Sequence, residues 1–212
     1  MKTNKNVKTV VAYGDSNTWG WNPAAGDRHP AHVRWTGVLQ DRLGAPWEVI
    51  EEGLSGRTTV WDDPIEEHKN GKQQIVPILL SHKPIDVVVI MLGTNDLKQR
   101  YAVCAADVAE SLATLVRTAA AAQVGPDDGQ PRFLLVAPVR VAGLTDWAEQ
   151  FAGAEQKSLL LAAQIEAVAA RLGVAFVDAD SVARPSPLDG VHLDAQAHRA
   201  IGELVASTII DW

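Results

Sequence analysis

Three residues, one near the start of the chain and two near its end, have side chains that together could perform acyl-transfer chemistry. They are Ser16, Asp189 and His192. A serine hydroxyl is a poor nucleophile until a histidine takes its proton, and that histidine needs a carboxylate to orient it. A turn at Gly190 could bring the Asp189 carboxylate to the imidazole Nδ1–H and leave Nε2 facing outward. We therefore consider Ser16 as a nucleophile, His192 as its base and Asp189 as the orienting group.

Two further residues could donate hydrogen bonds to the oxyanion that forms in acyl transfer. Gly53 can present its backbone N–H with no side chain in the way, and Asn95 carries a side-chain amide. Ser16 would stand at the start of a helix or turn, where free N–H groups favour developing negative charge.

Each of these residues also has a simpler interpretation. Ser16 could cap the next element, Asp189 could belong to a surface turn, Gly53 could be a turn glycine and Asn95 could cap a helix. The chemical interpretation therefore depends on whether the fold brings all of them to one place.

Short apolar runs alternate with longer segments of helical period along the chain. Strands are expected at residues 7–13, 47–51, 86–92, 132–137 and 174–177, and helices at 35–43, 75–81, 107–122, 155–172 and after Asp194. The strand runs are continuously apolar, which is typical of strands covered on both faces. This order predicts an α/β fold with a doubly wound, five-stranded parallel sheet and helices on both faces.

Local signals mark several helix ends. Asp107 and Glu110 resemble a capping box at the start of one helix, Gly173 can end another, and Asp194 can cap the last. Two long connections, residues 22–34 and 53–71, could be functional, or they could be variable surface loops or subunit contacts.

The polar segments follow the first, second, third and fifth expected strands, the last about ten residues on. In open parallel sheets, ligands bind outside the carboxyl ends of the strands. All four segments should therefore emerge at the same edge of the sheet.

The segments also match a known family. Gly14-Asp15-Ser16, Gly53, Gly93-Thr94-Asn95-Asp96 and Asp189-xx-His192 resemble, in order, the four blocks of the SGNH (GDSL-type) hydrolases. The stretches TWGW, RWTGVL, EVIEEGLSGRTT, IMLGTNDLK and DGVHL look like the arylesterase/acyltransferase branch. The resemblance implies an SGNH, flavodoxin-like three-layer sandwich, a Ser16–His192–Asp189 triad, and an oxyanion hole made by the Ser16 and Gly53 N–H groups and the Asn95 side chain.

The same resemblance implies a serine esterase that cleaves short-chain, acetyl-like esters, including aryl esters, through an acyl-enzyme. Some members pass the acyl group to alcohols or peroxide, several form homo-oligomers, and none needs a metal or an organic cofactor. A carbohydrate or natural-product O-acetyl esterase of the same fold remains the alternative. A binding module on an inactive scaffold is disfavoured, because no catalytic position is replaced.

Five residues are candidates for the substrate pocket: Asn17, Trp19, Trp21, Lys98 and Val191. Asn17 stands where the family name has leucine, which predicts a more polar pocket beside the serine. The tryptophans could wall the site or belong to the core, and Lys98 could face the entrance or simply be a solvated surface lysine. Glu51 stands where the family often has asparagine.

Composition excludes several other classes. The chain has 212 residues, which suits one domain over 1–212, and its formal net charge of −7 argues against binding to nucleic acid or an anionic membrane. The apolar run in the first 15 residues is too short for a secretory leader, and no segment approaches a membrane span. With a single cysteine, Cys104, a cytoplasmic protein is the default expectation.

Other motifs give weaker signals. Residues 178–182 match a DxDx[TV] phosphatase pattern, but no lysine follows it. No Gly-x-Gly-x-x-Gly follows the first strand, no P-loop is present, and the remaining histidines lack metal-ligand spacing. The sequence therefore predicts no metal site.

Overall fold

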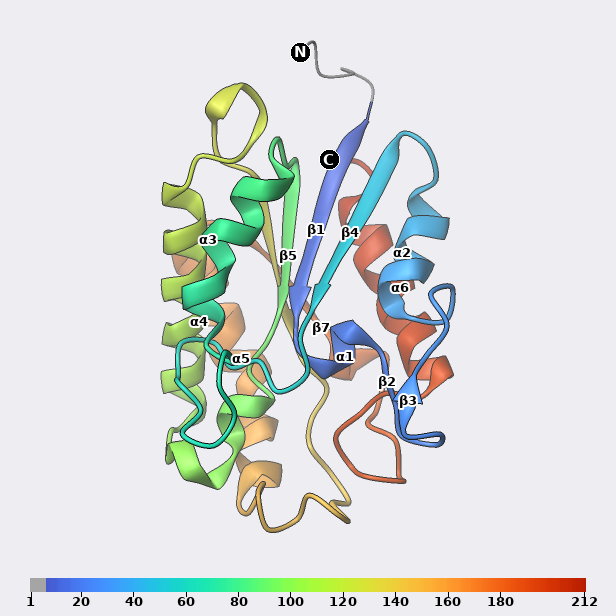
Figure 1. Cartoon of the computed structure of the whole chain (residues 1–212), viewed down its shortest axis with the longest axis vertical. Coiled ribbons are helices and arrows are strands. Elements are labelled where there is room, and N and C mark those ends of the chain that lie inside the picture. The colour runs from blue at the N-terminus through green and yellow to red at the C-terminus, as the bar shows by residue number, and fades with distance from the viewer. Residues whose placement is uncertain (1–6) are drawn as a thin grey trace.

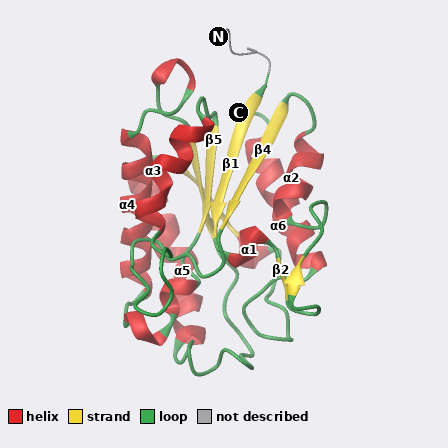
Figure 2. Ribbon diagram, in the orientation of Figure 1, coloured by secondary structure: helices red, strands yellow, loops and turns green. Residues whose placement is uncertain are grey.

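The computed structural model describes residues 7–212 and contains a five-stranded parallel sheet with the order β4-β1-β5-β6-β7 (Figures 1 and 2). The strands are β1 (Lys8–Gly14), β4 (Trp47–Gly53), β5 (Val87–Met91), β6 (Arg132–Ala137) and β7 (Ala175–Asp178). All five predicted strands are confirmed to within two residues at each end, and so is the parallel sheet. Residues 1–6, which include part of the stretch considered above as a leader, lie outside the described residues.

Helices cover both faces of the sheet. Helices α2 (Trp35–Leu43) and α6 (Ala195–Ile209) pack on one face, and α3 (Gly71–His82), α4 (Ala105–Ala121) and α5 (Ala154–Leu172) cover the other (Figure 1). Alternate side chains of each strand point to opposite faces. In β1, Val11 and Tyr13 therefore enter one hydrophobic core, while Val10 and Ala12 enter the other.

The helix ends follow local chemistry, with one correction. Gly173 ends α5 in the left-handed conformation, and Asp194 caps α6 by accepting the Ala197 N–H at 2.8 Å. The predicted capping box at Asp107 and Glu110 is wrong. Helix α4 begins earlier, with Cys104 as its N-cap, and Asp107 is the third helical residue, whose carboxylate accepts the Cys104 N–H at 3.0 Å.

The helix or turn expected at Ser16 is the one-turn helix α1 (Ser16–Trp19), whereas the short antiparallel pair β2 (Trp21–Asn22) and β3 (Asp27–Arg28) was not predicted. The pair begins one residue before the predicted connection 22–34, and the other connection, 53–71, folds back through a bridge between Thr58 and Asn70. Helix α3 starts at Gly71, four residues before the predicted start.

None of the helices in the described part of the chain is both long and apolar enough to cross a membrane.

Candidate active site

Ser16, His192 and Asp189 meet at the carboxyl edge of the sheet, although Ser16 and His192 are 176 residues apart. The Ser16 hydroxyl lies 3.0 Å from His192 Nε2, and His192 Nδ1 lies 2.6 Å from Asp189 Oδ2. All three residues are buried. A Nδ1–H that donates to the carboxylate leaves the Nε2 lone pair free to accept the serine proton.

The loop that carries His192 is held by the same carboxylate. Asp189 Oδ1 accepts the backbone N–H groups of Val191 and His192, each at 2.9 Å, while Oδ2 faces the imidazole. Burial raises the pKa of Asp189, but the hydrogen bonds from His192 and Val191 outweigh it, so the pKa lies below its usual value. The carboxylate is therefore ionised at neutral pH.

Gly190 makes this tight turn possible. Its φ is +78°, a conformation that glycine adopts without steric cost. A Cβ at this position would lie 2.6 Å from the Ala142 carbonyl oxygen, so the neighbouring loop leaves no room for a side chain.

Helix α1 presents Ser16 as its first residue. Asp15 caps it by accepting the Asn17 N–H at 2.9 Å, and the first N–H groups of a helix have no partner within it. The helix crosses so close to β4 that a Cβ on Gly53 would lie 2.1 Å from the Trp19 nitrogen. Only glycine fits there.

The Gly53 N–H points away from the sheet. The next residue, Leu54, donates its N–H to the Gly14 carbonyl at 3.1 Å, and successive N–H groups of a strand point in opposite directions. Since β4 is an edge strand, the Gly53 N–H is not needed by a neighbouring strand.

Asn95 lies just after β5, in the short helix Asn95–Leu97. Its Nδ2 donates to the Arg57 carbonyl at 3.2 Å and approaches Asp15 Oδ2 at 3.4 Å. Burial raises the pKa of Asp15 to about 6, opposed by hydrogen bonding to the Asn17 N–H and by the charges of His192, Arg57 and Lys98. The amide is thus anchored beside the serine helix.

A cavity of about 160 Å³ opens beside Ser16 and His192. Its walls differ in chemistry, and they consist of an aromatic side (Trp21, Trp147 and Phe151) and a polar side (Ser55, Gly56, Glu66 and Lys98), with Asn95 and Val191 between them. The ring centroids of Trp21 and Trp147 lie 5.7 and 6.4 Å from that of His192.

Comparison with known proteins shows which family the chain belongs to. Residues 12–200 match the GDSL-like lipase/acylhydrolase family. The chain belongs to this family. An aryl esterase from M. smegmatis has the same fold with 38% sequence identity and a TM-score of 0.92, over 97% of this chain and 99% of that one.

Two structures from Sinorhizobium meliloti are also similar. The carbohydrate acetylesterase Est24 shares 35% identity at a TM-score of 0.93, over 96% of this chain and 99% of Est24. A carbohydrate acetylesterase family member shares 38% identity at 0.88, over 96% and 97%. No curated protein sequence matches the chain. The predicted membership of the SGNH hydrolases is confirmed, and the protein is a carboxylic ester hydrolase.

Of the five residues predicted for the substrate pocket, only some line the cavity of the esterase. Trp21, Lys98 and Val191 line the cavity, whereas Asn17 and Trp19 do not. Asn17 is buried and donates from Nδ2 to the Val191 carbonyl at 3.3 Å, and its Oδ1 has no partner. It therefore ties the serine helix to the histidine loop instead of adding polarity to the pocket.

Trp19 supports the esterase's aromatic wall from behind. Its ring stacks on Trp21, with centroids 6.4 Å apart, and the Arg28 guanidinium lies 4.9 Å from the centroid of the Trp19 ring. Arg28 in turn pairs with Glu51, which also binds Arg34. Glu51, where the family often has asparagine, thus anchors this hairpin to the sheet.

Sequence reasoning missed several residues of the esterase's cavity. Trp147 and Phe151 come from residues 138–153, the connection after β6, and their i, i+4 spacing was the available signal. Ser55, Gly56 and Glu66 come from the 53–71 connection, whose length had marked it as a candidate for function. Lys98 was predicted either to face the pocket entrance or to be a solvated surface lysine; it lines the cavity and is only 5% exposed.

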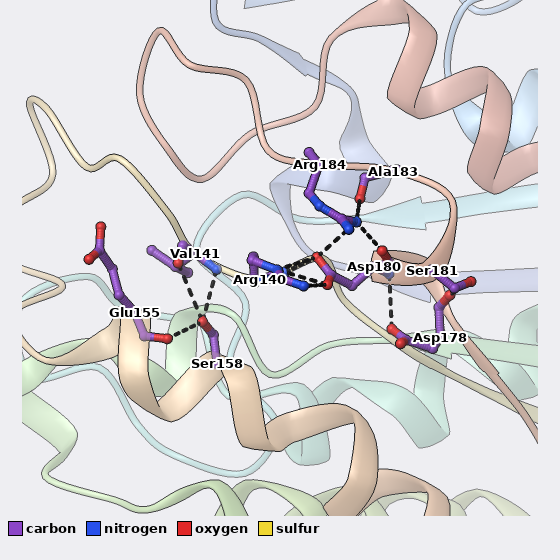
Figure 3. Close-up of polar contacts among 9 residues, drawn as sticks. All are labelled: Arg140, Val141, Glu155, Ser158, Asp178, Asp180, Ser181, Ala183 and Arg184. Atoms are coloured by element: carbon purple, nitrogen blue, oxygen red, sulfur yellow. Dashed lines mark hydrogen bonds and ion pairs between the residues drawn. The ribbon is translucent and has the colours of Figure 1, made fainter.

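The phosphatase-like segment of the esterase is occupied by structural contacts (Figure 3). Asp180 accepts hydrogen bonds from the Arg140 Nε at 2.8 and 3.0 Å and from its Nη2, and Asp178 accepts the Asp180 N–H at 2.9 Å. Between residues 7 and 212, no three acidic, histidine or cysteine side chains are grouped so that they could hold a metal ion.

Proposed function

We propose that the esterase cleaves short-chain, acetyl-like esters through an acyl-enzyme on Ser16. The observation that carries this proposal is the chain of contacts from Ser16 Oγ to His192 Nε2 at 3.0 Å and from His192 Nδ1 to Asp189 Oδ2 at 2.6 Å. These distances are within the range expected for a nucleophile, its base and the group that orients the base.

In the first half-reaction, Ser16 Oγ attacks the ester carbonyl while its proton moves to His192 Nε2. Asp189 stabilises the imidazolium that results. The imidazolium then gives the proton to the leaving alcohol oxygen as the carbon–oxygen bond breaks, and the acyl group remains on Ser16. Water, activated by His192, releases the acid in the second half-reaction.

The oxyanion is assigned to three donors. They are the Ser16 N–H at the start of α1, the Gly53 N–H at the sheet edge, and the Asn95 amide. Their placement on three different elements beside one serine supports this role. Losing one such donor typically costs about 3–4 kcal/mol of transition-state stabilisation.

The cavity supports a short acyl group. The cavity beside Ser16 measures about 160 Å³, which is below the roughly 300–1,000 Å³ of typical ligand pockets. The names of two similar structures, an aryl esterase from M. smegmatis and a carbohydrate acetylesterase from Sinorhizobium meliloti, point to aryl esters and sugar acetates as the substrate classes to test here. Both substrates present a flat or ringed alcohol, and Trp21 and Trp147 can stack on either.

Acyl transfer to alcohols or peroxide is part of the proposal. The aromatic wall limits the water that can surround the acyl-enzyme, which favours an acceptor that packs on the rings. To test this, the partition between hydrolysis and transfer is measured as an alcohol is titrated against an activated ester. If the enzyme's ratio of acyl transfer to hydrolysis equals the ratio found when free hydroxide reacts with the same ester, the aromatic wall has no such role.

A homo-oligomer and a cytoplasmic location complete the proposal. Leu159 and Leu160 on α5 are 56% and 59% exposed, and side chains of this kind are often covered between subunits. Light scattering in solution and cell fractionation test these two points.

The decisive experiment for the function is hydrolysis of 4-nitrophenyl esters of increasing chain length. We expect kcat/KM to fall beyond the shortest acyl chains, and Ser16→Ala to lower it by a factor of roughly 10⁴ or more. Ser111→Ala is the control, because Ser111 is a buried serine of α4 that bonds only to the Asp107 carbonyl. Near-normal turnover by Ser16→Ala contradicts the proposal.

A further inference from the structure

Lys98 is a cation inside the cavity that the mechanism above does not use. It lines the same space as Ser16 and is only 5% exposed. Across residues 7–212, its ammonium makes no hydrogen bond and no ion pair, and its nitrogen is still reached by solvent, so it is free to bind a partner in the cavity. Burial lowers the pKa of Lys98, which is the expected response of an ammonium that lacks a partner.

The charges around Lys98 already have partners. Glu66 pairs with Lys69 at 3.3 Å, and Lys69 also donates to the Ser55 carbonyl at 2.9 Å. Nearby, Asp63 pairs with Arg100 at 3.0 Å and accepts the Tyr101 hydroxyl at 2.7 Å. These two carboxylates thus neutralise two other cations, and Lys98 is left over.

We propose that Lys98 is an anion subsite of the esterase, and that it selects esters carrying a carboxylate close to the scissile bond. This inference rests on the proposed function, because it assumes that the ester carbonyl lies at Ser16. A carboxylate in the cavity would give the ammonium its missing hydrogen-bond partner, and charge-assisted bonds of this kind are roughly twice as strong as neutral ones.

The size of the cavity limits where the carboxylate can be. Lys98 and Ser16 line one space of about 160 Å³, so only a few bonds can separate the carboxylate from the reacting carbonyl. Two substrate types meet this condition: a short diacid half-ester, charged on the acyl side, and an aryl acetate with a ring carboxylate, charged on the alcohol side. The chemistry at Lys98 is the same for both.

The test compares charged and neutral esters in matched pairs. Monoethyl succinate is compared with diethyl succinate for the acyl side, and 4-acetoxybenzoate with its methyl ester for the alcohol side. Each kcat/KM is divided by the hydroxide rate of the same ester, which removes the intrinsic difference in reactivity. The readout is the charged-to-neutral ratio in wild type, Lys98→Met, Lys98→Arg and the control Lys72→Met, whose lysine is exposed on α3.

We expect wild type to favour the charged ester roughly tenfold in at least one pair. The pair that shows this preference tells whether Lys98 binds a carboxylate on the acyl side or on the alcohol side of the ester. Lys98→Met should bring that ratio close to one, while Lys98→Arg and Lys72→Met should keep it. The proposal is overturned if wild type shows no preference in either pair, or if Lys98→Met keeps the preference. These two results can be distinguished from a failure of the proposed function. In that case, Ser16→Ala would cleave the neutral esters as well as wild type does.

A second measurement serves if Lys98→Met does not fold, as judged by circular dichroism. Benzoate and benzamide have similar shapes but differ in charge, and both are tested as competitive inhibitors of the wild-type enzyme. Inhibition by benzoate at a concentration roughly tenfold lower supports the subsite. Equal inhibition by the two compounds overturns it.

Discussion

Two aspartate-containing segments follow the same strand, β7, but one has a structural role and the other a proposed catalytic role. Asp180, two residues beyond the strand, is held by the Arg140 guanidinium (Figure 3), whereas Asp189, eleven residues beyond it, holds the His192 imidazole. The pKa of each carboxyl is lowered by its partner against the effect of burial. The carboxylates are therefore alike, and the partner decides what each can do.

The difference lies in the chemistry of the partners. A guanidinium keeps its charge at all physiological pH values, so the Arg140–Asp180 pair can only join the connection after β6 to that after β7. An imidazole has two nitrogen atoms with separate roles. A carboxylate on Nδ1 therefore sets the protonation of Nε2, which faces Ser16 at 3.0 Å.

The largest expected effect is that of Asp189→Asn. The asparagine amide would favour the tautomer with the proton on Nε2, so His192 could no longer accept the proton of Ser16. We expect kcat to fall by roughly 10⁴, far more than the stability of about 1–2 kcal/mol lost with the carboxylate charge could explain. Asp180→Asn, measured alongside on the same acetyl ester, should retain most of the activity. If the two variants lose similar amounts of activity, the two aspartates do not have the different roles proposed for them.

Gly190→Ala tests the turn that places the histidine. Its Cβ would press against the Ala142 carbonyl oxygen, so the loop must shift and carry His192 away from Ser16. We expect a loss of roughly 100-fold in kcat, since small misplacements of catalytic groups have effects of that order. Gly143→Ala is the matched control: its φ is +70°, but a Cβ there meets nothing within 4 Å. If both variants lose activity equally, backbone strain and not the clash explains the result.

Asn17→Leu tests the bond that holds the histidine loop from the serine side. The Val191 carbonyl would lose the Nδ2 donor, and we expect kcat/KM to fall by roughly tenfold, in keeping with a net contribution of about 1 kcal/mol per hydrogen bond. The loss should be the same for all acyl chain lengths, because Asn17 does not line the cavity. A changed chain-length profile would show that Asn17 acts on the substrate.

Asp180→Asn should act on stability far more than on catalysis. We expect a loss of about 1–2 kcal/mol in the free energy of unfolding at neutral pH, because the hydrogen bonds from Arg140 to a carboxylate become bonds to a neutral amide. A lowered carboxyl pKa contributes stability above its ordinary value of 3.8, and this is lost as the pH falls through the lower folded-state value. The difference between wild type and variant should therefore shrink in acid. A difference that is the same at neutral and strongly acidic pH would argue against the ion pair as its cause.

The sheet and its strands could be predicted from the sequence because the signals for them, apolar runs and helical periodicity, are local. Continuous apolar runs such as residues 87–91 and the alternation with helical segments lead directly to a parallel sheet. The topology then places Ser16, Gly53, Asn95 and His192 at one edge. The helix start at Asp107 was misplaced because its carboxylate bonds backward to Cys104, which the residue pattern does not distinguish from an N-cap.

The cavity walls were harder to predict, because they depend on how loops pack. Trp147 and Phe151 belong to a connection with no strand or cap signal, and only its position after β6 brings them to His192. Lys98 shows the same limit, since a lysine beside a polar block is usually exposed. Lys98 lines the cavity together with Gly56 and Glu66 of the 53–71 connection, and residue patterns do not show how such loops meet.

The central claim is that Ser16 is the nucleophile, and covalent labelling tests it most directly. The enzyme is treated with 4-nitrophenyl diethyl phosphate, which traps a nucleophilic serine as a stable phosphate ester, and the product is examined by intact mass and peptide mapping. The account predicts one adduct per chain, located on Ser16, with one equivalent of nitrophenol released and loss of esterase activity. An adduct on another residue that abolishes activity, or full activity with Ser16 labelled, would contradict it.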